Sequence, residues 1–195
     1  DGGRRALFAA ARQWREQNPM LGTRGVRLGI LKTGLYRMQA RAIGEAVGIR
    51  REAGGDPRAR IMVPLVVTGA ELALVRRWID EVLTEVLGDS GAVDEVHVGT
   101  MIETPRAAIR GDEVAAHADF FSFGTNDLTQ LTFGFSRDDV EHRMMPRYLE
   151  EGILSRNPCE TFDRRGGGEL VRLGVERGRS VRPSRHIGVC GEHGG

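Results

Sequence analysis

Residues able to do acid–base, thiol and metal chemistry stand next to short apolar runs in this 195-residue sequence. Glu103 follows the run VHVGTMI, Asn126 and Asp127 come shortly after FFSF, and Cys190 ends the run IGVC. Arg24 lies in NPMLGTRG, just ahead of another apolar stretch. Parallel α/β proteins bind ligands at the carboxyl ends of their strands. If the runs are neighbouring strands, we expect these side chains to converge on one mouth.

The two carboxylates suit a divalent cation. Glu103 and Asp127 would offer hard oxygen ligands from two strands to Mg²⁺, with substrate and water in the other positions. By residue type alone, each carboxylate is also explained as a helix cap or as the partner of an arginine. An Asx turn also explains Asn126 and Asp127. The sequence leaves these alternatives open.

The residue types of Arg24, Arg137 and Cys190 are each compatible with more than one role. Arg24 and Arg137 could fork onto a phosphate or a carboxylate. Exposure on the surface, or an ion pair between Arg137 and Asp138 or Asp139, explains them as well. Cys190, at a strand end, could be a nucleophile, a proton donor or a small core residue.

Three other chemistry-bearing residues are assigned to structure. Cys159 has no partner pattern, and His97 lies inside an apolar run, so we expect a buried structural thiol and a core histidine. His193 could be a base or a ligand, but a polar loop residue is the simpler interpretation. The segment CGEH has no second Cys/His pair at metal spacing, which argues against zinc.

Composition narrows the class of protein. Charged residues make up 28% and apolar residues 40% of the chain, and the net charge is +1. These values are typical of a globular protein and argue against nucleic acid or a membrane surface as the main partner. Two cysteines make no disulfide framework and fit a reducing cytosol, so we predict a cytoplasmic protein.

Continuous apolar runs predict the strands that position the candidate residues. These runs cover Ile61–Val67, Val96–Ile102, Phe120–Phe123 and Ile187–Cys190, with Val26–Leu31 as a weaker fifth candidate. Unbroken rather than alternating apolarity is typical of parallel strands that are covered on both faces.

Helical patterns separate these runs. Between Leu72 and Val86 apolar residues recur every three or four positions, behind a capping-box sequence, TGAE, at 68–71. Thr104 and Pro105 are typical of the start of a helix, which we expect to reach about His117. Further helices are expected over Leu35–Glu52 and Glu169–Glu176.

Strand and helix alternate about five times, which implies right-handed βαβ units in a parallel sheet or barrel. Five units do not close an eight-stranded barrel, which takes about 250 residues. The sheet is therefore either open or part of a larger barrel.

Four segments together resemble the C-terminal, phosphoenolpyruvate-binding domain of pyruvate, phosphate dikinase. They are NPMLGTRG, GTMIETPRAA, FFSFGTNDLTQLTFGFSRDD and GVCGEHGG, in the family's order from about Asn18 to the end. Phosphoenolpyruvate synthase and the first enzyme of the sugar phosphotransferase system have similar GTND and CGE segments. The FGFSRDD stretch and the GEHGG ending fit the dikinase best.

The resemblance implies a (β/α)₈ TIM-type barrel, with about five of its eight strand–helix units in this chain. Residues 1–195 would form one incomplete barrel domain that binds phosphoenolpyruvate or pyruvate, truncated at both ends. The family's nucleotide-binding and phosphohistidine domains would lie outside this sequence, as would strands before Asn18 and after Gly195.

The resemblance also implies residue roles. Arg24 and Arg137 would contact the phosphate and carboxylate of the substrate. Glu103 and Asp127 would hold Mg²⁺ and touch the substrate, and Cys190 would be the proton donor. The residues that line the substrate would be Gly124, Thr125 and Asn126.

The implied reaction converts ATP, pyruvate and phosphate into AMP, phosphoenolpyruvate and diphosphate. A phosphohistidine on another domain of the full-length chain would pass its phosphoryl group to the pyruvate enolate, so the fragment alone should not turn over. The family also implies a homodimer for the full-length protein. Two alternatives stay open: a phosphoenolpyruvate synthase, and a non-catalytic module that binds phosphoenolpyruvate or dimerises.

Overall fold

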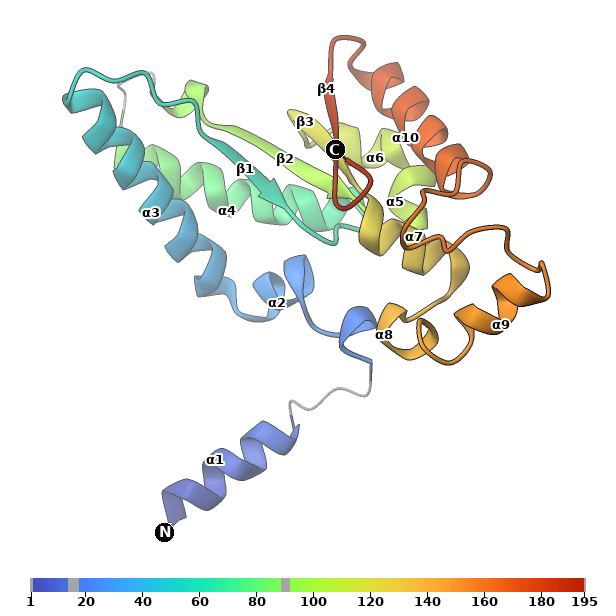
Figure 1. Ribbon diagram of the computed structural model, residues 1–195. Coiled ribbons are helices and arrows are strands. Elements are labelled where there is room, and N and C mark those ends of the chain that lie inside the picture. Colours follow the sequence, from blue (N-terminus) through green and yellow to red (C-terminus); the bar gives the residue numbers. More distant parts are fainter. Residues whose placement is uncertain (1, 14–17, 89–91, 195) are drawn as a thin grey trace.

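A parallel four-stranded sheet forms the centre of the computed structural model, which describes residues 2–13, 18–88 and 92–194. The strand order is β1 (Arg60–Val63), β2 (His97–Ile102), β3 (Phe120–Gly124) and β4 (His186–Cys190) (Figure 1). In the register, Ile102 lies beside Phe123 and Gly124 beside Cys190. All carboxyl ends therefore meet at one edge, where the candidate residues follow.

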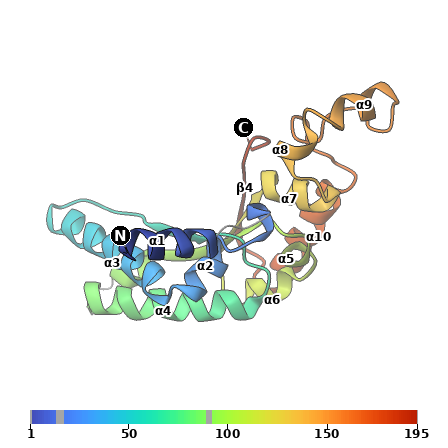
Figure 2. The same ribbon diagram turned by 90° about the horizontal axis from the view of Figure 1, so that it is seen from below.

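Helices connect these strands. Their bounds are α1 (Gly2–Gln13), α2 (Gly25–Leu31), α3 (Thr33–Glu52), α4 (Gly69–Leu87), α5 (Pro105–Ile109), α6 (Gly111–Ala115), α7 (Thr125–Phe133), α8 (Arg137–Val140), α9 (Met145–Glu150) and α10 (Gly167–Val181), with short 3₁₀ helices at Pro19–Leu21 and Ala92–Glu95. Helix α3 packs on α4, and α10 packs on α5 and α6. Figure 2 shows α7, α8 and α9 on the side of the chain's C-terminal end, with α4 and α6 on the other side. Helix α1 stands apart in Figure 1.

Local signals explain the best-predicted helix, α4. Its apolar face is buried, including Leu72, Val75 and Ile79. The capping box is formed as predicted: Thr68 Oγ1 accepts from Glu71 N at 3.2 Å, and Glu71 Oε2 accepts from Thr68 N at 2.8 Å. Both free amides at the helix start are therefore satisfied.

The core lies between the sheet and the helices that cover it. Phe121 and Phe123 on β3 are fully buried. Helix α10 approaches their rings at two glycines, because a Cβ at Gly178 would lie 2.6 Å from the Phe121 ring and one at Gly174 would lie 2.9 Å from the Phe123 ring. Spacing of four residues puts both glycines on the face of α10 that meets the sheet.

The predicted fifth strand, Val26–Leu31, is wrong, since these residues belong to helix α2. Its buried residues, Val26 and Gly29, are three positions apart, which is the spacing of a helix face. The strand predicted to reach Val67 ends at Val63. Pro64 has no N–H for the ladder, and Leu65 adopts φ +58, so the chain leaves the sheet there.

Two further expectations need correction. The helix predicted from Pro105 to about His117 is two short helices, α5 and α6, with a break at Arg110 (φ −110°, ψ 40°). His97 is exposed rather than in the core, because it is the first residue of β2 and lies at the open end of the strand. The N-cap at Thr104 is confirmed by its 3.3 Å hydrogen bond from Ala107 N.

Candidate functional site

The carboxyl edge of the sheet brings three of the candidate segments together. Glu103 directly follows β2, Gly124 ends β3, and Thr125 begins α7 without an intervening loop. Cys190 ends β4 beside Gly124. A Cβ on Gly124 would lie 2.6 Å from Glu103 Oε2, so the strand end and this carboxylate are in close contact.

Glu103 is buried, with 2% of its surface exposed. Burial raises its pKa, and the nearby negative charge of Asp127 acts in the same direction. The hydrogen bond from Leu65 N to Glu103 Oε1, at 2.7 Å, and the charge of Arg24 act against this rise. The ionised carboxylate is thus under-compensated by the protein, which is typical of functional sites.

Leu65, whose backbone N–H donates to Glu103, is a partner of this carboxylate that the sequence did not reveal. It is buried in a left-handed conformation, φ +58, which costs about 1–2 kcal/mol for a residue with a Cβ. A Cβ on Gly25 would lie 3.0 Å from the Leu65 Cβ, so glycine is needed for this approach. Glu103 therefore anchors the segment after β1 against the segment that carries Arg24.

Arg24 and Asp127 form an ion pair across the mouth. Arg24 Nη2 lies 2.9 Å from Asp127 Oδ2, and the two side chains are 42% and 15% exposed. Asp127 is therefore the partner of an arginine, which was one of the alternatives that its residue type left open. The exposed part of the guanidinium faces solvent and can donate further hydrogen bonds.

The two carboxylates fit a hard cation in charge and donor type. Asp127 raises the pKa of Glu103, so the two groups are close enough to repel, and a divalent cation would relieve that repulsion. Carboxylate oxygens are preferred ligands of Mg²⁺, which commonly takes one or two from a protein and the rest from water and substrate. Within the described residues, three or more acidic, histidine or cysteine side chains do not gather into a metal cage.

Thr125 and Asn126 hold the C-terminal loop, residues 190–194. Thr125 Oγ1 donates to the Cys190 carbonyl oxygen at 3.0 Å. Asn126 Oδ1 accepts from Glu192 N at 3.0 Å. Gly191 adopts φ +95, and a Cβ there would lie 2.6 Å from Thr125 Oγ1, so only glycine allows the loop this close to α7.

Cys190 lies half-buried at this edge. Its thiol donates to the Phe123 carbonyl oxygen at 3.5 Å, a contact that keeps the sulfur beside the end of β3. Cys159, by contrast, is buried as predicted, and burial raises its thiol pKa. Reactivity needs a thiolate that can be reached, so Cys190 is the better candidate for chemistry.

Arg137, in α8, contacts the C-terminal loop. Its guanidinium lies 2.6 Å from Glu192 Oε1 and 3.7 Å from Glu141 Oε2. These two glutamates, rather than the alternative partners Asp138 and Asp139, form its ion pairs. The hydrogen bond to Glu192 raises the pKa of Arg137, and it lowers the pKa of Glu192. Arg137 therefore lies against the C-terminal loop, which begins at Cys190.

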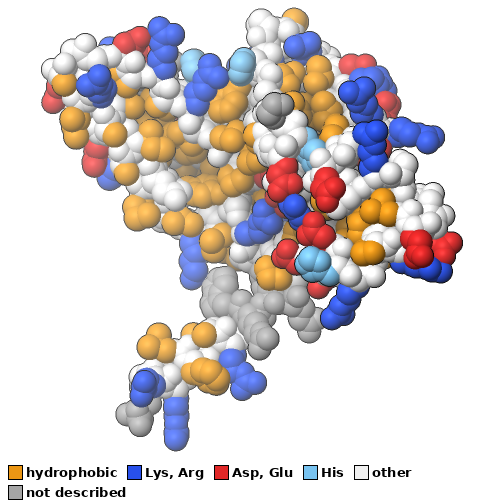
Figure 3. Space-filling view, viewed as in Figure 1, with side chains coloured by type: hydrophobic (Ala, Val, Ile, Leu, Met, Phe, Trp, Pro, Cys, Tyr) orange, Lys and Arg blue, Asp and Glu red, His pale blue; other side chains and the backbone are white. Residues whose placement is uncertain are grey.

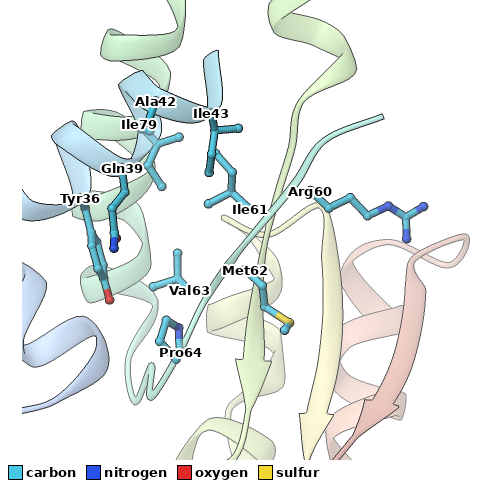
Figure 4. A pocket seen from close by; sticks show the side chains of 11 residues that line it. Tyr36, Gln39, Ala42, Ile43, Arg60, Ile61, Met62, Val63, Pro64 and Ile79 are labelled. Atoms are coloured by element: carbon cyan, nitrogen blue, oxygen red, sulfur yellow. The ribbon is translucent and has the colours of Figure 1, made fainter. Parts of the chain in front are cut away.

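Figure 3 shows acidic and basic side chains gathered over α7 and towards α8, whereas hydrophobic side chains gather over β1 and β2. A cavity of about 600 Å³ opens in this hydrophobic region. Tyr36, Gln39 and Ile43 of α3 face Ile61 and Val63 of β1 across it (Figure 4). The candidate residues do not line this cavity.

In the part of the chain that the structure describes, every helix is too short or too polar to cross a membrane.

Comparison with known proteins gives a consistent result. A sequence model of the phosphoenolpyruvate-binding domain of PEP-utilising enzymes matches residues 2–195. The chain is 54% identical over 180 residues to pyruvate, phosphate dikinase 2 of Oryza sativa subsp. japonica, which covers 92% of this chain and 20% of that protein. It is 50% identical over 189 residues to the chloroplastic pyruvate, phosphate dikinase of Mesembryanthemum crystallinum, covering 97% of this chain and 20% of that protein.

A third relative, chloroplastic pyruvate, phosphate dikinase 1 of Arabidopsis thaliana, is 52% identical over 180 residues, with 92% of this chain and 19% of that protein covered. The chain therefore spans about a fifth of the length of the curated relatives it matches. Because the family match extends over nearly all of its residues, the chain belongs to the PEP-utilising enzymes and corresponds to their PEP-binding domain.

Proposed function

We propose that this chain is the phosphoenolpyruvate- and pyruvate-binding part of a pyruvate, phosphate dikinase. The full-length protein would convert ATP, pyruvate and phosphate into AMP, phosphoenolpyruvate and diphosphate. The observation that carries the proposal is the meeting of Glu103, the Arg24–Asp127 ion pair and the Cys190 thiol at one sheet edge. The names of the relatives support the same reaction.

The four parallel strands are, in this proposal, part of a (β/α)₈ barrel, and residues 1–195 are an incomplete barrel domain. The unbroken parallel order supports this, because helices return each strand to the same direction. Domains with a nucleotide site and a phosphohistidine would come from other parts of a full-length chain. We also propose a homodimer for the full-length protein, and a reducing compartment such as the cytoplasm for its two unpaired cysteines.

Glu103 and Asp127 would hold Mg²⁺ in this site. Bound there, Mg²⁺ would act as a Lewis acid that favours negative charge on the substrate oxygens. Arg24 already neutralises Asp127 and has exposed donors left for a carboxylate or phosphate. Arg137 would reach the substrate by giving up its contact with Glu192, an exposed pair that costs little to break.

Cys190 would carry the proton of the reaction. In the direction of phosphoenolpyruvate synthesis, the C3–H bond of pyruvate breaks and its proton passes to the Cys190 thiolate. The electron pair forms the C2–C3 double bond, and the carbonyl oxygen becomes an enolate. That oxygen attacks phosphorus as the N–P bond of the phosphohistidine breaks. In reverse, the thiol returns its proton to C3.

The test is exchange of solvent deuterium into the methyl group of pyruvate by the full-length protein. Cys190→Ala should slow this Mg²⁺-dependent exchange at least about 100-fold, the usual loss for an acid–base group. Cys159→Ser is the matched control and should exchange normally, because it keeps the size and polarity of a buried side chain that no proposed step uses. Exchange at the wild-type rate in Cys190→Ala would show that Cys190 does not move the proton.

A further inference from the structure

A small polar cavity lies beside the C-terminal loop. Its volume is about 10 Å³, which is close to what one enclosed water molecule needs. The side chains around it come from α7, α8, the segment before α10 and the loop itself: Asn126, Thr129, Gln130, Arg137, Cys159 and His193. None of the steps proposed above for Cys190 explains why this cavity is polar.

Two of these side chains place buried polar atoms in it without a partner among the described residues. These atoms are Nδ1 and Nε2 of His193 and Oγ1 of Thr129, and Thr129 is only 3% exposed. Buried polar atoms in folded proteins are almost always hydrogen-bonded. A neutral imidazole has one donor and one acceptor, and a hydroxyl has both. One water molecule between them would satisfy both side chains.

The His193 ring is the part of the loop that enters the molecule. It packs on Phe162 with 5.5 Å between the ring centroids. Within the loop, Gly194 N donates to the Gly191 carbonyl oxygen at 3.1 Å and closes a tight turn. A Cβ on Gly194 would lie 3.0 Å from the Cys190 Cα. Because the turn is this compact, the position of the imidazole determines the position of Cys190.

We propose that His193 is a positioning residue for Cys190, held by a buried water molecule that joins its imidazole to Thr129 Oγ1. This inference rests on the proposed function, in which Cys190 transfers the C3 proton. Three direct hydrogen bonds, with Thr125, Asn126 and Arg137, hold the loop. The water-linked imidazole adds a contact at His193, so the whole turn is fixed against α7.

The first experiment separates hydrogen bonding from ring packing in the full-length protein. His193→Phe keeps a flat ring against Phe162 and removes both nitrogens. We expect deuterium exchange into pyruvate to slow about 10- to 100-fold, since small displacements of a reacting group have effects of this size. The KM for pyruvate should change by a smaller factor than the exchange rate, because Arg137 lines the cavity around His193 but Glu103, Arg24 and Asp127 do not.

Two further variants complete this comparison. His193→Gln retains a donor and an acceptor, so it should recover most of the exchange rate. His97→Ala is the matched control, because His97 is exposed at the opposite end of β2, and it should exchange like the wild type. Exchange at the wild-type rate in His193→Phe would overturn the positioning role.

The second experiment tests the shared water without relying on catalysis. The rate of Cys190 alkylation by iodoacetamide is measured by peptide mass spectrometry in His193→Phe, Thr129→Val and the double variant. Each single variant should be alkylated several-fold faster than the wild type, because the loop is released. The double variant should be no faster than the faster single variant, since both lose the same water.

These results distinguish the two proposals. Normal exchange in Cys190→Ala contradicts the proposed function. Loss of exchange in Cys190→Ala together with normal exchange in His193→Phe contradicts only the positioning role. Unchanged alkylation rates contradict the positioning role whatever the protein catalyses, and rates that multiply in the double variant contradict the shared water.

Discussion

Gly124 is where the close packing of the candidate site can be tested most directly. Its backbone is ordinary (φ −84°, ψ 92°), so an alanine there is not strained by its dihedral angles. The difficulty is space, since the new Cβ would lie 2.6 Å from Glu103 Oε2, 2.6 Å from Met101 Cε and 2.9 Å from Glu103 Cβ. Ordinary contact begins at 3.4 Å.

The three close contacts do not have the same cost. The Met101 methyl group can swing aside, and the Glu103 carboxylate can rotate. Glu103 Cβ is attached to the backbone, so relief there needs a shift of the strand end, and overpacking of this kind costs about 1–3 kcal/mol. Rotation of the carboxylate would also take the acceptor from Leu65 N, and a buried amide without a partner costs about 1–3 kcal/mol more.

We therefore expect Gly124→Ala to lower the free energy of unfolding by at least about 2 kcal/mol. The measurement is urea unfolding of the chain, followed by circular dichroism. Gly188→Ala is the matched control on the neighbouring strand, because its nearest atoms are Ser122 Oγ at 3.9 Å and a carbonyl oxygen at 4.0 Å. If both variants unfold within about 0.5 kcal/mol of each other, the packing of Glu103 against β3 is not as tight as argued.

Three further predictions use the charges around the sheet. Because the pKa of Glu103 is raised, the contribution of its protonated carboxyl group to stability is present below the usual value of 4.5 and is lost as the pH rises through the raised pKa. In parallel urea titrations without divalent cations, Glu103→Gln should therefore become more stable relative to the wild type over that rise. Added Mg²⁺ should stabilise only the wild type. Asp119→Asn should behave oppositely, losing stability at neutral pH, with the difference disappearing in acid as the pH falls through the lowered pKa of Asp119. Arg24→Lys should weaken phosphoenolpyruvate binding by the full-length protein about tenfold or more in calorimetry, because the bidentate fork of the guanidinium is lost. Its effect on the free energy of unfolding should be less than about 1 kcal/mol, because the ion pair is partly exposed. Equal phosphoenolpyruvate binding by the variant and the wild type would remove Arg24 from the site.

The sequence predicted elements well where a local signal decided them. The capping box at Thr68 and the apolar face of α4 depend on residues three or four positions apart, so they can be read along the chain. The runs that became β2, β3 and β4 were mostly apolar, which is typical of parallel strands, although β4 is only partly buried. The convergence of Glu103, Asp127 and Cys190 was predicted on the condition that these runs are neighbouring strands, and the strand order meets that condition.

Features that depend on distant contacts could not be predicted. The left-handed conformation of Leu65 is stabilised by Glu103, which lies 38 residues away in the chain, and no residue type near Leu65 indicates it. Proximity in sequence offered Asp138 and Asp139 as alternative partners of Arg137, but Arg137 pairs with Glu192, 55 residues further on. The buried, unpartnered nitrogens of His193 depend on the packing of the C-terminal loop against α7 and Phe162, which the sequence does not reveal.

A comparison of two carboxylates supports the location of the site. At Asp119 burial alone would raise the pKa, but the hydrogen bond from Val98 N at 2.9 Å and the ion pair with Arg76 at 2.9 Å lower it. The protein therefore stabilises that charge, as expected for a structural group. Glu103 is buried more deeply. Its burial and the charge of Asp127 raise its pKa by more than the Leu65 hydrogen bond and the charge of Arg24 lower it. In the proposed function, a bound divalent cation would stabilise the ionised form of Glu103, and the hard oxygens of Glu103 and Asp127 favour such a cation.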